Sequence, residues 1–201
     1  MKSLANWIMR RRAQGLLKIL EPYLPAEGLA VDVGSGTGHN AEVLRKATSL
    51  RVSEFDVADI HWVGPGPTII VDDKLPLGSD SAACVLILYV LHYCPEPAAL
   101  LADAARVSPS KVLVLQTTYK SPLARQVLRV QEFFFGRFGY HMARIAGLVP
   151  AGTCPLQPTR YFNRDSLEFV FAQAGLRILE RNTFSHPSWP LRCDLYQLRK
   201  G

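Results

Sequence analysis

Hydrophobic positions along the chain fall partly at helical spacing and partly in short continuous runs. Residues 1–23 place leucine and isoleucine at helical spacing, and Pro22 and Pro25 predict the end of this amino-terminal helix. Helices are likewise predicted at 40–47 and 96–106. Five strands are predicted from apolar runs at 29–33, 51–55, 68–71, 83–89 and 111–116. Strands that alternate with helices in this way predict an α/β, doubly wound, mostly parallel sheet.

The pattern changes after Thr118. Residues 121–147 have helical character, and three prolines follow in 150–158. Residues 164–174 predict a helix that Gly175 ends, with Asn163 or Asp165 as its cap. A strand pair is predicted last, at 176–184 and 191–199, which brings the sheet to seven strands. We therefore expect one domain over 1–201, with an amino-terminal helix within 1–25 and an insertion at 119–160.

Composition places the chain among ordinary globular proteins. It has 201 residues, 48% of them hydrophobic and 20% charged, which excludes disorder, collagen-like repeats and coiled coil. The net charge of +6 permits an anionic partner without requiring one. The four cysteines form no CxxC pair, so we expect neither a zinc ribbon nor any other metal site, and we interpret the thiols as reduced and the protein as cytoplasmic. No stretch predicts a signal peptide or a spanning helix.

The most informative segment joins the first predicted strand to the next helix. It reads Val31-Asp32-Val33-Gly34-Ser35-Gly36-Thr37-Gly38. Glycines at such a turn permit positive φ and let a ligand approach the main chain, next to the unpaired N–H groups of a helix start. The spacing is GxGxG, whereas a dinucleotide site needs GxGxxG and a phosphate-binding loop needs GK[ST]. The loop therefore predicts a ligand without a pyrophosphate, which disfavours a dinucleotide oxidoreductase.

Over residues 29–116 the chain resembles the class I S-adenosylmethionine-dependent methyltransferases, particularly the type 11 small-molecule group. The resemblance implies a Rossmann-like methyltransferase fold with S-adenosyl-L-methionine as cofactor. In that family the glycine loop wraps the cofactor and an early acid, here Asp32, helps to orient its ammonium group. The acid that closes strand two accepts the ribose hydroxyls, which implies this role for Asp56 and a place in the site for Val57. Glu54 is the rival carboxylate, but it falls inside the predicted strand.

Two further segments resemble family motifs. Val71-Asp72-Asp73-Lys74-Leu75-Pro76 is similar to the segment that holds the adenine amino group. Asp72 and Asp73 both fit that role, and Asp72 is favoured. Leu88-Tyr89-Val90-Leu91-His92-Tyr93 is similar to the segment after strand four, with Leu88 or Tyr89 in the place of the usual acid. The resemblance thus adds Leu88 to the expected cofactor contacts.

Methyl transfer is an in-line displacement in which the protein mainly supplies position and excludes water. His92 and Tyr93 are the candidate catalytic residues, with His92 as a base if the acceptor must lose a proton. A packed loop histidine is the alternative interpretation of His92. The family resemblance implies that 119–160 forms a helical lid, and its phenylalanines predict a small hydrophobic or aromatic acceptor. An amphipathic helix packed on the core would have the same pattern.

The sequence gives weaker signals for binding partners than for the cofactor. An RNA methyltransferase is supported only by the net charge, so nucleic acid is not an expected partner. A cofactor-binding protein without transfer activity is a further alternative, suggested by the absent acid at strand four. Trp7 with Arg10, Arg11 and Arg12 is compatible with peripheral contact to an anionic membrane, although a solvated basic face explains the same residues. The oligomeric state is not predicted.

Overall fold

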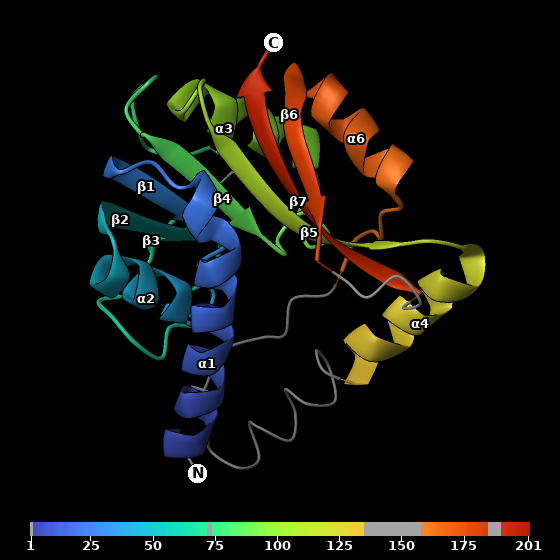
Figure 1. Ribbon diagram of the computed structural model, residues 1–201, viewed down its shortest axis with the longest axis horizontal. Helices are drawn as coiled ribbons and strands as arrows, with labels where there is room; N and C mark the ends of the chain where they lie inside the picture. The colour runs from blue at the N-terminus through green and yellow to red at the C-terminus, as the bar shows by residue number, and fades with distance from the viewer. Residues whose placement is uncertain (1, 72–73, 135–157, 185–189) are drawn as a thin grey trace.

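A seven-stranded sheet forms the centre of the molecule, in the order β3-β2-β1-β4-β5-β7-β6 (Figure 1). The computed structural model describes residues 2–71, 74–134, 158–184 and 190–201. Strands β1 to β5 are mutually parallel, while β7 runs antiparallel to both β5 and β6. The strands are β1 Glu27–Val33, β2 Ser49–Asp56, β3 Thr68–Ile69, β4 Cys84–Leu88, β5 Val112–Tyr119, β6 Leu176–Thr183 and β7 Leu191–Lys200.

Helices cover both faces of the sheet, as the alternating pattern predicts. They are α1 Lys2–Leu20, the short 3-10 helix η1 Glu21–Tyr23, α2 His39–Ala47, α3 Pro97–Val107, α4 Pro122–Glu132 and α6 Arg164–Gln173. One apolar layer packs α1 and α2 on alternate strand residues, among them Leu86 and Leu113. The other packs α3 and α6 on the residues between, such as Val85 and Val114. The predicted doubly wound fold is therefore confirmed.

The observed strands differ from the predicted ones mainly at their carboxyl ends. β4 ends at Leu88, because Tyr89 has a φ of 63°, which an extended strand does not allow. β5 continues to Tyr119, three residues past its predicted end, because it pairs with β7 as far as Leu191. In the described parts of 57–83, β3 is the only regular element, so loops lead from β2 to β3 and from β3 to β4.

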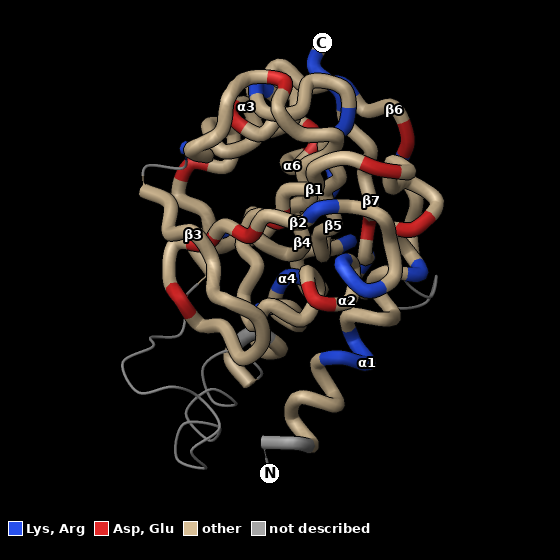
Figure 2. The backbone as a smooth tube through the Cα atoms, turned by 90° about the vertical axis from the view of Figure 1, so that its left-hand side faces the viewer, with Lys and Arg blue, Asp and Glu red and all other residues tan. Residues whose placement is uncertain are grey.

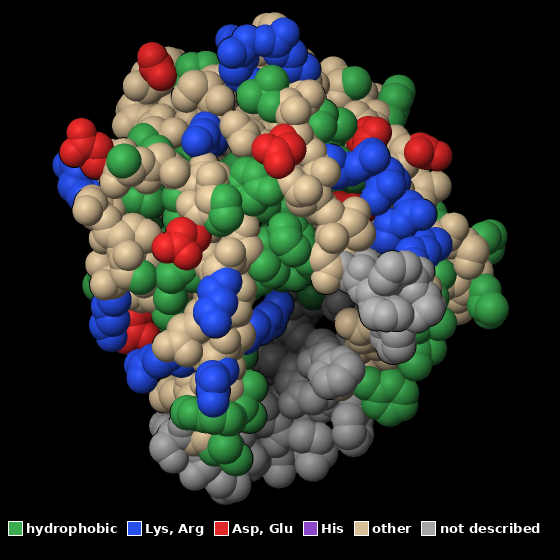
Figure 3. Space-filling model, in the orientation of Figure 1, with side chains coloured by type: hydrophobic (Ala, Val, Ile, Leu, Met, Phe, Trp, Pro, Cys, Tyr) green, Lys and Arg blue, Asp and Glu red, His purple; other side chains and the backbone are tan. Residues whose placement is uncertain are grey.

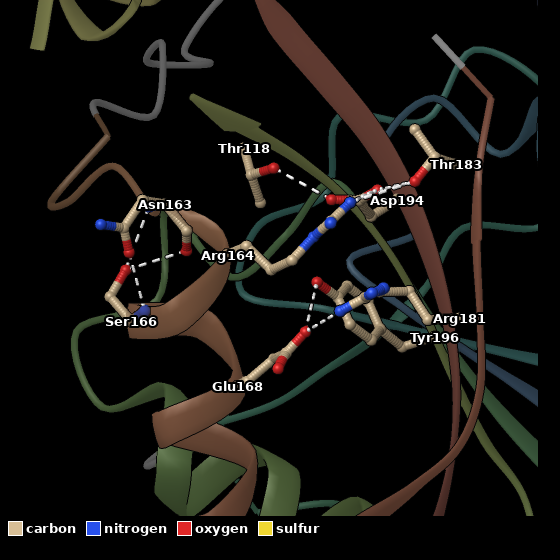
Figure 4. A network of polar contacts seen from close by, with 9 residues as sticks. All are labelled: Thr118, Asn163, Arg164, Ser166, Glu168, Arg181, Thr183, Asp194 and Tyr196. Atoms are coloured by element: carbon tan, nitrogen blue, oxygen red, sulfur yellow. Dashed lines mark hydrogen bonds and ion pairs between the residues drawn. The ribbon is translucent and has the colours of Figure 1, made fainter. Parts of the chain in front are cut away.

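A buried ion pair fixes β7 and α6 against β5 (Figure 4). Asp194 is fully buried on β7 and receives hydrogen bonds from Thr118 at 3.1 Å, Arg164 at 2.9 Å and Thr183 at 2.5 Å. Each of these three partners comes from a different element, so the carboxylate joins β5, α6 and the end of β6. Asn163 caps α6 through Ser166 in a capping box, which confirms one of the two predicted caps.

The structure describes only part of the predicted insertion at 119–160. It begins with α4, whose cap is Ser121. Most of the predicted lid, 135–157, lies outside the described residues, so the lid stays a prediction. In the described part of the chain, no helix combines the length and the apolar character needed to cross a membrane.

Candidate functional site

The glycine loop follows β1 directly and is held open by its own backbone. Gly34, Gly36 and Gly38 all have positive φ, between 57° and 79°. A Cβ on Gly34 would lie 2.3 Å from a methyl of Val90, so close packing against the segment after β4 requires glycine there. A Cβ on Gly36 would meet nothing closer than 3.9 Å. The space beside Gly36 is therefore free for a ligand to approach the main chain.

Asp56 closes β2 beside this space. Its Oδ2 accepts a hydrogen bond from the Gly36 N–H at 2.8 Å, and its Oδ1 accepts one from the Val57 N–H at 2.7 Å. The carboxylate is thus turned inward, toward the glycine loop, and is 5% exposed. The Ala58 N–H also donates to Oδ1, at 3.4 Å, whereas Oδ2 accepts the one bond from Gly36 and keeps a second acceptor position for a hydroxyl donor. Val57 itself is exposed at the same edge.

Asp32 is the most unusual group of the site. It is fully buried on β1, and neither of its carboxylate oxygens has a hydrogen-bond partner among the described residues. Burial, together with the nearby charges of Glu54 and Asp56, raises the pKa of Asp32 to about 8. A buried polar group without a partner is costly, and a pKa perturbed by several units is typical of functional sites. Such a carboxyl group is suited to a cationic ligand.

Glu54 belongs to the frame of the site. It lies opposite Asp32 in the register of β1 and β2, inside the strand as predicted. Its Oε2 pairs with Arg45 of α2 at 2.5 Å, and its Oε1 lies 3.4 Å from His61 Nε2. Its charge is therefore already compensated by neighbours, in contrast to that of Asp32.

A segment that the sequence patterns did not single out covers one side of the glycine loop. The N–H groups of Trp62 and Val63 donate to the carbonyl of Thr37, and His61 Nε2 lies 2.9 Å from the Ser35 hydroxyl. The Thr37 hydroxyl lies 2.9 Å from His39 Nδ1 at the start of α2. The side chains of Ser35 and Thr37 therefore contact the protein itself. No motif in residues 57–67 indicated this contact.

The segment after β4 reaches the same edge of the sheet. Leu88 packs in the layer beneath α1 and α2, and the Tyr89 hydroxyl lies 3.0 Å from Cys193 Sγ. Val90 contacts Gly34, as described above, so this segment forms a wall next to the glycine loop. The rings of Tyr93 and His92 are in contact, with centroids 4.2 Å apart and planes tilted by 53°.

His92 is buried and held by Gln116, a residue of β5 that the sequence reasoning did not single out. Gln116 Nε2 donates to His92 Nδ1 at 2.5 Å, which places the ring hydrogen on Nε2. That Nε2 is buried and has no partner among the described residues. Burial lowers the pKa of His92 to about 4, so the ring is neutral near pH 7. In this arrangement His92 is a hydrogen-bond donor through Nε2, and its use as a base stays a prediction.

The predicted site residues are thus partly brought together. Gly36, Asp56 and Asp32 meet at the ends of β1 and β2, and Gly34 joins them to the segment that carries His92. Asp72 and Asp73 lie outside the described residues. The one sequence signal for Gln116 was that a polar residue follows the apolar run at 112–115 and ends the predicted strand.

The strand order, the reversed β7 and the glycine loop at the end of β1 together define a class I, Rossmann-like methyltransferase fold. The profile of a methyltransferase domain family matches residues 6–181. The chain therefore belongs to this family, as an S-adenosylmethionine-dependent methyltransferase with S-adenosylmethionine as its cofactor. The buried carboxyl of Asp32 and the open approach at Gly36 fit that cationic nucleoside.

Solved structures share this fold at low sequence identity. Geranyl diphosphate C-methyltransferase from Streptomyces coelicolor is 8% identical with a TM-score of 0.65, covering 95% of this chain and 80% of that one. A Burkholderia thailandensis 1,6-didemethyltoxoflavin N1-methyltransferase is 14% identical with a TM-score of 0.60, covering 96% and 78%. An Aquifex aeolicus methyltransferase is 14% identical with a TM-score of 0.57, covering 94% and 97%. No curated protein matches the sequence.

Proposed function

We propose that the enzyme transfers the methyl group of S-adenosylmethionine to a small hydrophobic or aromatic acceptor. The observation that carries the proposal is the space beside Gly36, which is bounded by the carboxylate of Asp56 and lies near the buried, unpartnered Asp32. The cofactor supplies a methyl group already activated on a sulfonium. The protein's task is then to bind, orient and keep out water.

Each residue of the site has a distinct part in this proposal. Asp56 accepts a ribose hydroxyl at the acceptor position that Gly36 leaves free on Oδ2. Asp32 provides the negative charge for the ammonium group. His92 uses its Nε2 hydrogen to orient an oxygen of the acceptor, and Gln116 holds the ring for this purpose. Tyr93, whose ring contacts that of His92, shapes the acceptor side.

The small, apolar acceptor is supported by two observations. The helix α4 follows β5 at the edge that carries the site and exposes Val127, Val130 and Phe133. In addition, two structures with the same fold are named for small acceptors, geranyl diphosphate and 1,6-didemethyltoxoflavin. The second of these acceptors is aromatic and the first carries a hydrocarbon chain beside its diphosphate, and these apolar parts agree with apolar side chains on α4.

The test uses S-adenosylmethionine with a radioactive methyl group, a panel of aromatic and isoprenoid acceptors, and total RNA. We expect label in the organic extract. Label in acid-precipitable RNA would identify RNA as the acceptor and overturn the small-molecule assignment. Cofactor binding without transfer to any acceptor would favour a non-catalytic protein. Asp56→Asn should weaken cofactor binding about tenfold, or about 1.4 kcal/mol, through the loss of a charged acceptor. Asp165→Asn, an exposed change on α6, is the matched control.

A further inference from the structure

The amino-terminal half of α1 extends beyond the packed body of the protein. None of its side chains from residue 4 to residue 12 is buried, and packing against the sheet begins only at Ala13. Leu4, Trp7 and Ile8 are each more than half exposed. Their spacing of three and four places them on one side of the helix. The result is an apolar tip, defined as Leu4, Trp7 and Ile8, that the described part of the chain leaves uncovered.

A band of positive charge follows the apolar tip by one turn. It consists of Arg10, Arg11 and Arg12, and α1 contains no acidic residue. Arg10 also pairs with Glu42 of α2 at 3.2 Å, and the Arg11 guanidinium lies 5.2 Å from the Trp7 ring centroid. Figure 3 shows this order low on the left, with hydrophobic side chains below basic ones. Figure 1 and Figure 2 both show the amino-terminal half of α1 projecting from the body of the molecule.

We propose that the apolar tip and the arginine band of α1 together form a docking surface for an anionic lipid bilayer. Apolar residues at a helix end enter the acyl boundary while neighbouring arginines meet anionic headgroups. The charge decides the occupant, because a second copy of the chain would bring its own arginine band against this one. Since no described helix is suited to cross a membrane, the contact is peripheral.

The docking surface is joined to the site. The Arg12 guanidinium lies 5.4 Å from the centroid of the Tyr89 ring, and Leu16 of α1 belongs to the same apolar layer as Leu88. Tyr89 directly follows β4, on the segment that carries His92. Docking through α1 therefore holds the carboxyl edge of the sheet close to the membrane surface. The inference concerns binding alone and does not depend on methyl transfer.

Flotation of the full chain with vesicles tests the proposal. Vesicles of phosphatidylcholine with phosphatidylglycerol should carry the protein at about 0.1 M salt, and pure phosphatidylcholine vesicles should not. Binding should fall steeply at about 1 M salt, where the screening length is ~3 Å. Arg11→Glu and Trp7→Ser should each lower the partition coefficient about tenfold. Arg177→Glu on β6 and Phe169→Ser on α6, both exposed, are the matched controls and should bind like the wild type.

Two further readouts decide the outcome. Bromine-labelled anionic lipid should quench the fluorescence of Trp7, and Trp7→Phe should remove that quenching while the protein still floats. The proposal is overturned if the wild type does not bind anionic vesicles at low salt, or if Arg11→Glu and Trp7→Ser bind as it does. It is also overturned if light scattering shows a dimer that Trp7→Ser dissociates, because a second copy then covers the tip.

Discussion

The proton on Asp32 provides a direct test of the cofactor site. Burial and the neighbouring carboxylates raise the pKa of Asp32 to about 8, so near pH 7 about nine in ten molecules carry it protonated. A bound ammonium group favours the ionised carboxylate instead. Binding of S-adenosylmethionine near pH 7 should therefore release about 0.9 proton. By linkage, its dissociation constant should fall about tenfold from about pH 6 to about pH 7 and level off above about pH 8.

Isothermal titration calorimetry measures this proton directly. The apparent binding enthalpy near pH 7, plotted against the ionisation enthalpy of the buffer, has a negative slope whose size equals the number of protons released, because the buffer takes up each of them. Asp32→Asn keeps the size of the side chain but has no proton to release, so its slope should be zero and its affinity lower. Asp165→Asn, exposed on α6, should keep the wild-type slope.

Two results would refute this reasoning about Asp32. A wild-type slope of zero would mean that Asp32 is already ionised in the free protein or that the cofactor binds elsewhere. An unchanged slope in Asp32→Asn would assign the released proton to another group.

Three further predictions concern the same edge of the sheet. Since the pKa of Asp32 is higher in the folded than in the unfolded protein, its contribution to stability is complete below about pH 4 and is lost as the pH rises through about 8. Urea titration should thus show Asp32→Asn more stable by up to ~4 kcal/mol near pH 7 and no more stable near pH 3. Gly34→Ala should destabilise by roughly 3 kcal/mol in the same assay, whereas Gly36→Ala should cost only ~1 kcal/mol but abolish cofactor binding in calorimetry. Nitrogen-15 NMR should find His92 neutral above about pH 5 with its hydrogen on Nε2, and Gln116→Glu should move that hydrogen to Nδ1.

Each of these predictions has a clear contrary result. Equal stability of Asp32→Asn and the wild type near pH 7 would show that the buried carboxyl has a partner. Wild-type affinity in Gly36→Ala would place the cofactor away from the glycine loop. Titration of His92 near its ordinary pKa would mean that water reaches the ring and that Gln116 does not fix it.

Sequence patterns predicted the fold well because the strands are buried on both faces. Cys84 to Leu88 is apolar at every position and is fully enclosed in the structure, so period and composition agreed there. The strand ends were less predictable. The length of β5 depends on pairing with Leu191, more than seventy residues away, and local hydrophobicity carries no information about such a partner.

The glycine loop and Asp56 were also predictable, since a tight turn and a strand-closing acid leave a local pattern. The contacts that these site residues make with distant parts of the chain were not predictable. Gln116 and His92 are 24 residues apart in sequence, and their contact depends on β4 and β5 being adjacent. The cover of the glycine loop by Trp62 and Val63 uses main-chain N–H groups, which every residue type offers.

The same uncompensated charge on Asp32 both destabilises the free protein and attracts a cationic ligand. A buried carboxyl group without a partner destabilises the free protein once it ionises, and an asparagine of the same size would remove that cost. The uncompensated charge is also what distinguishes Asp32 from Glu54, whose charge Arg45 already balances. A cationic ligand that binds beside Asp32 offsets the cost, so binding free energy is converted into folding stability. S-adenosylmethionine should therefore raise the melting temperature more at about pH 8 than at about pH 6, because the free protein has more ionised Asp32 to compensate at the higher pH.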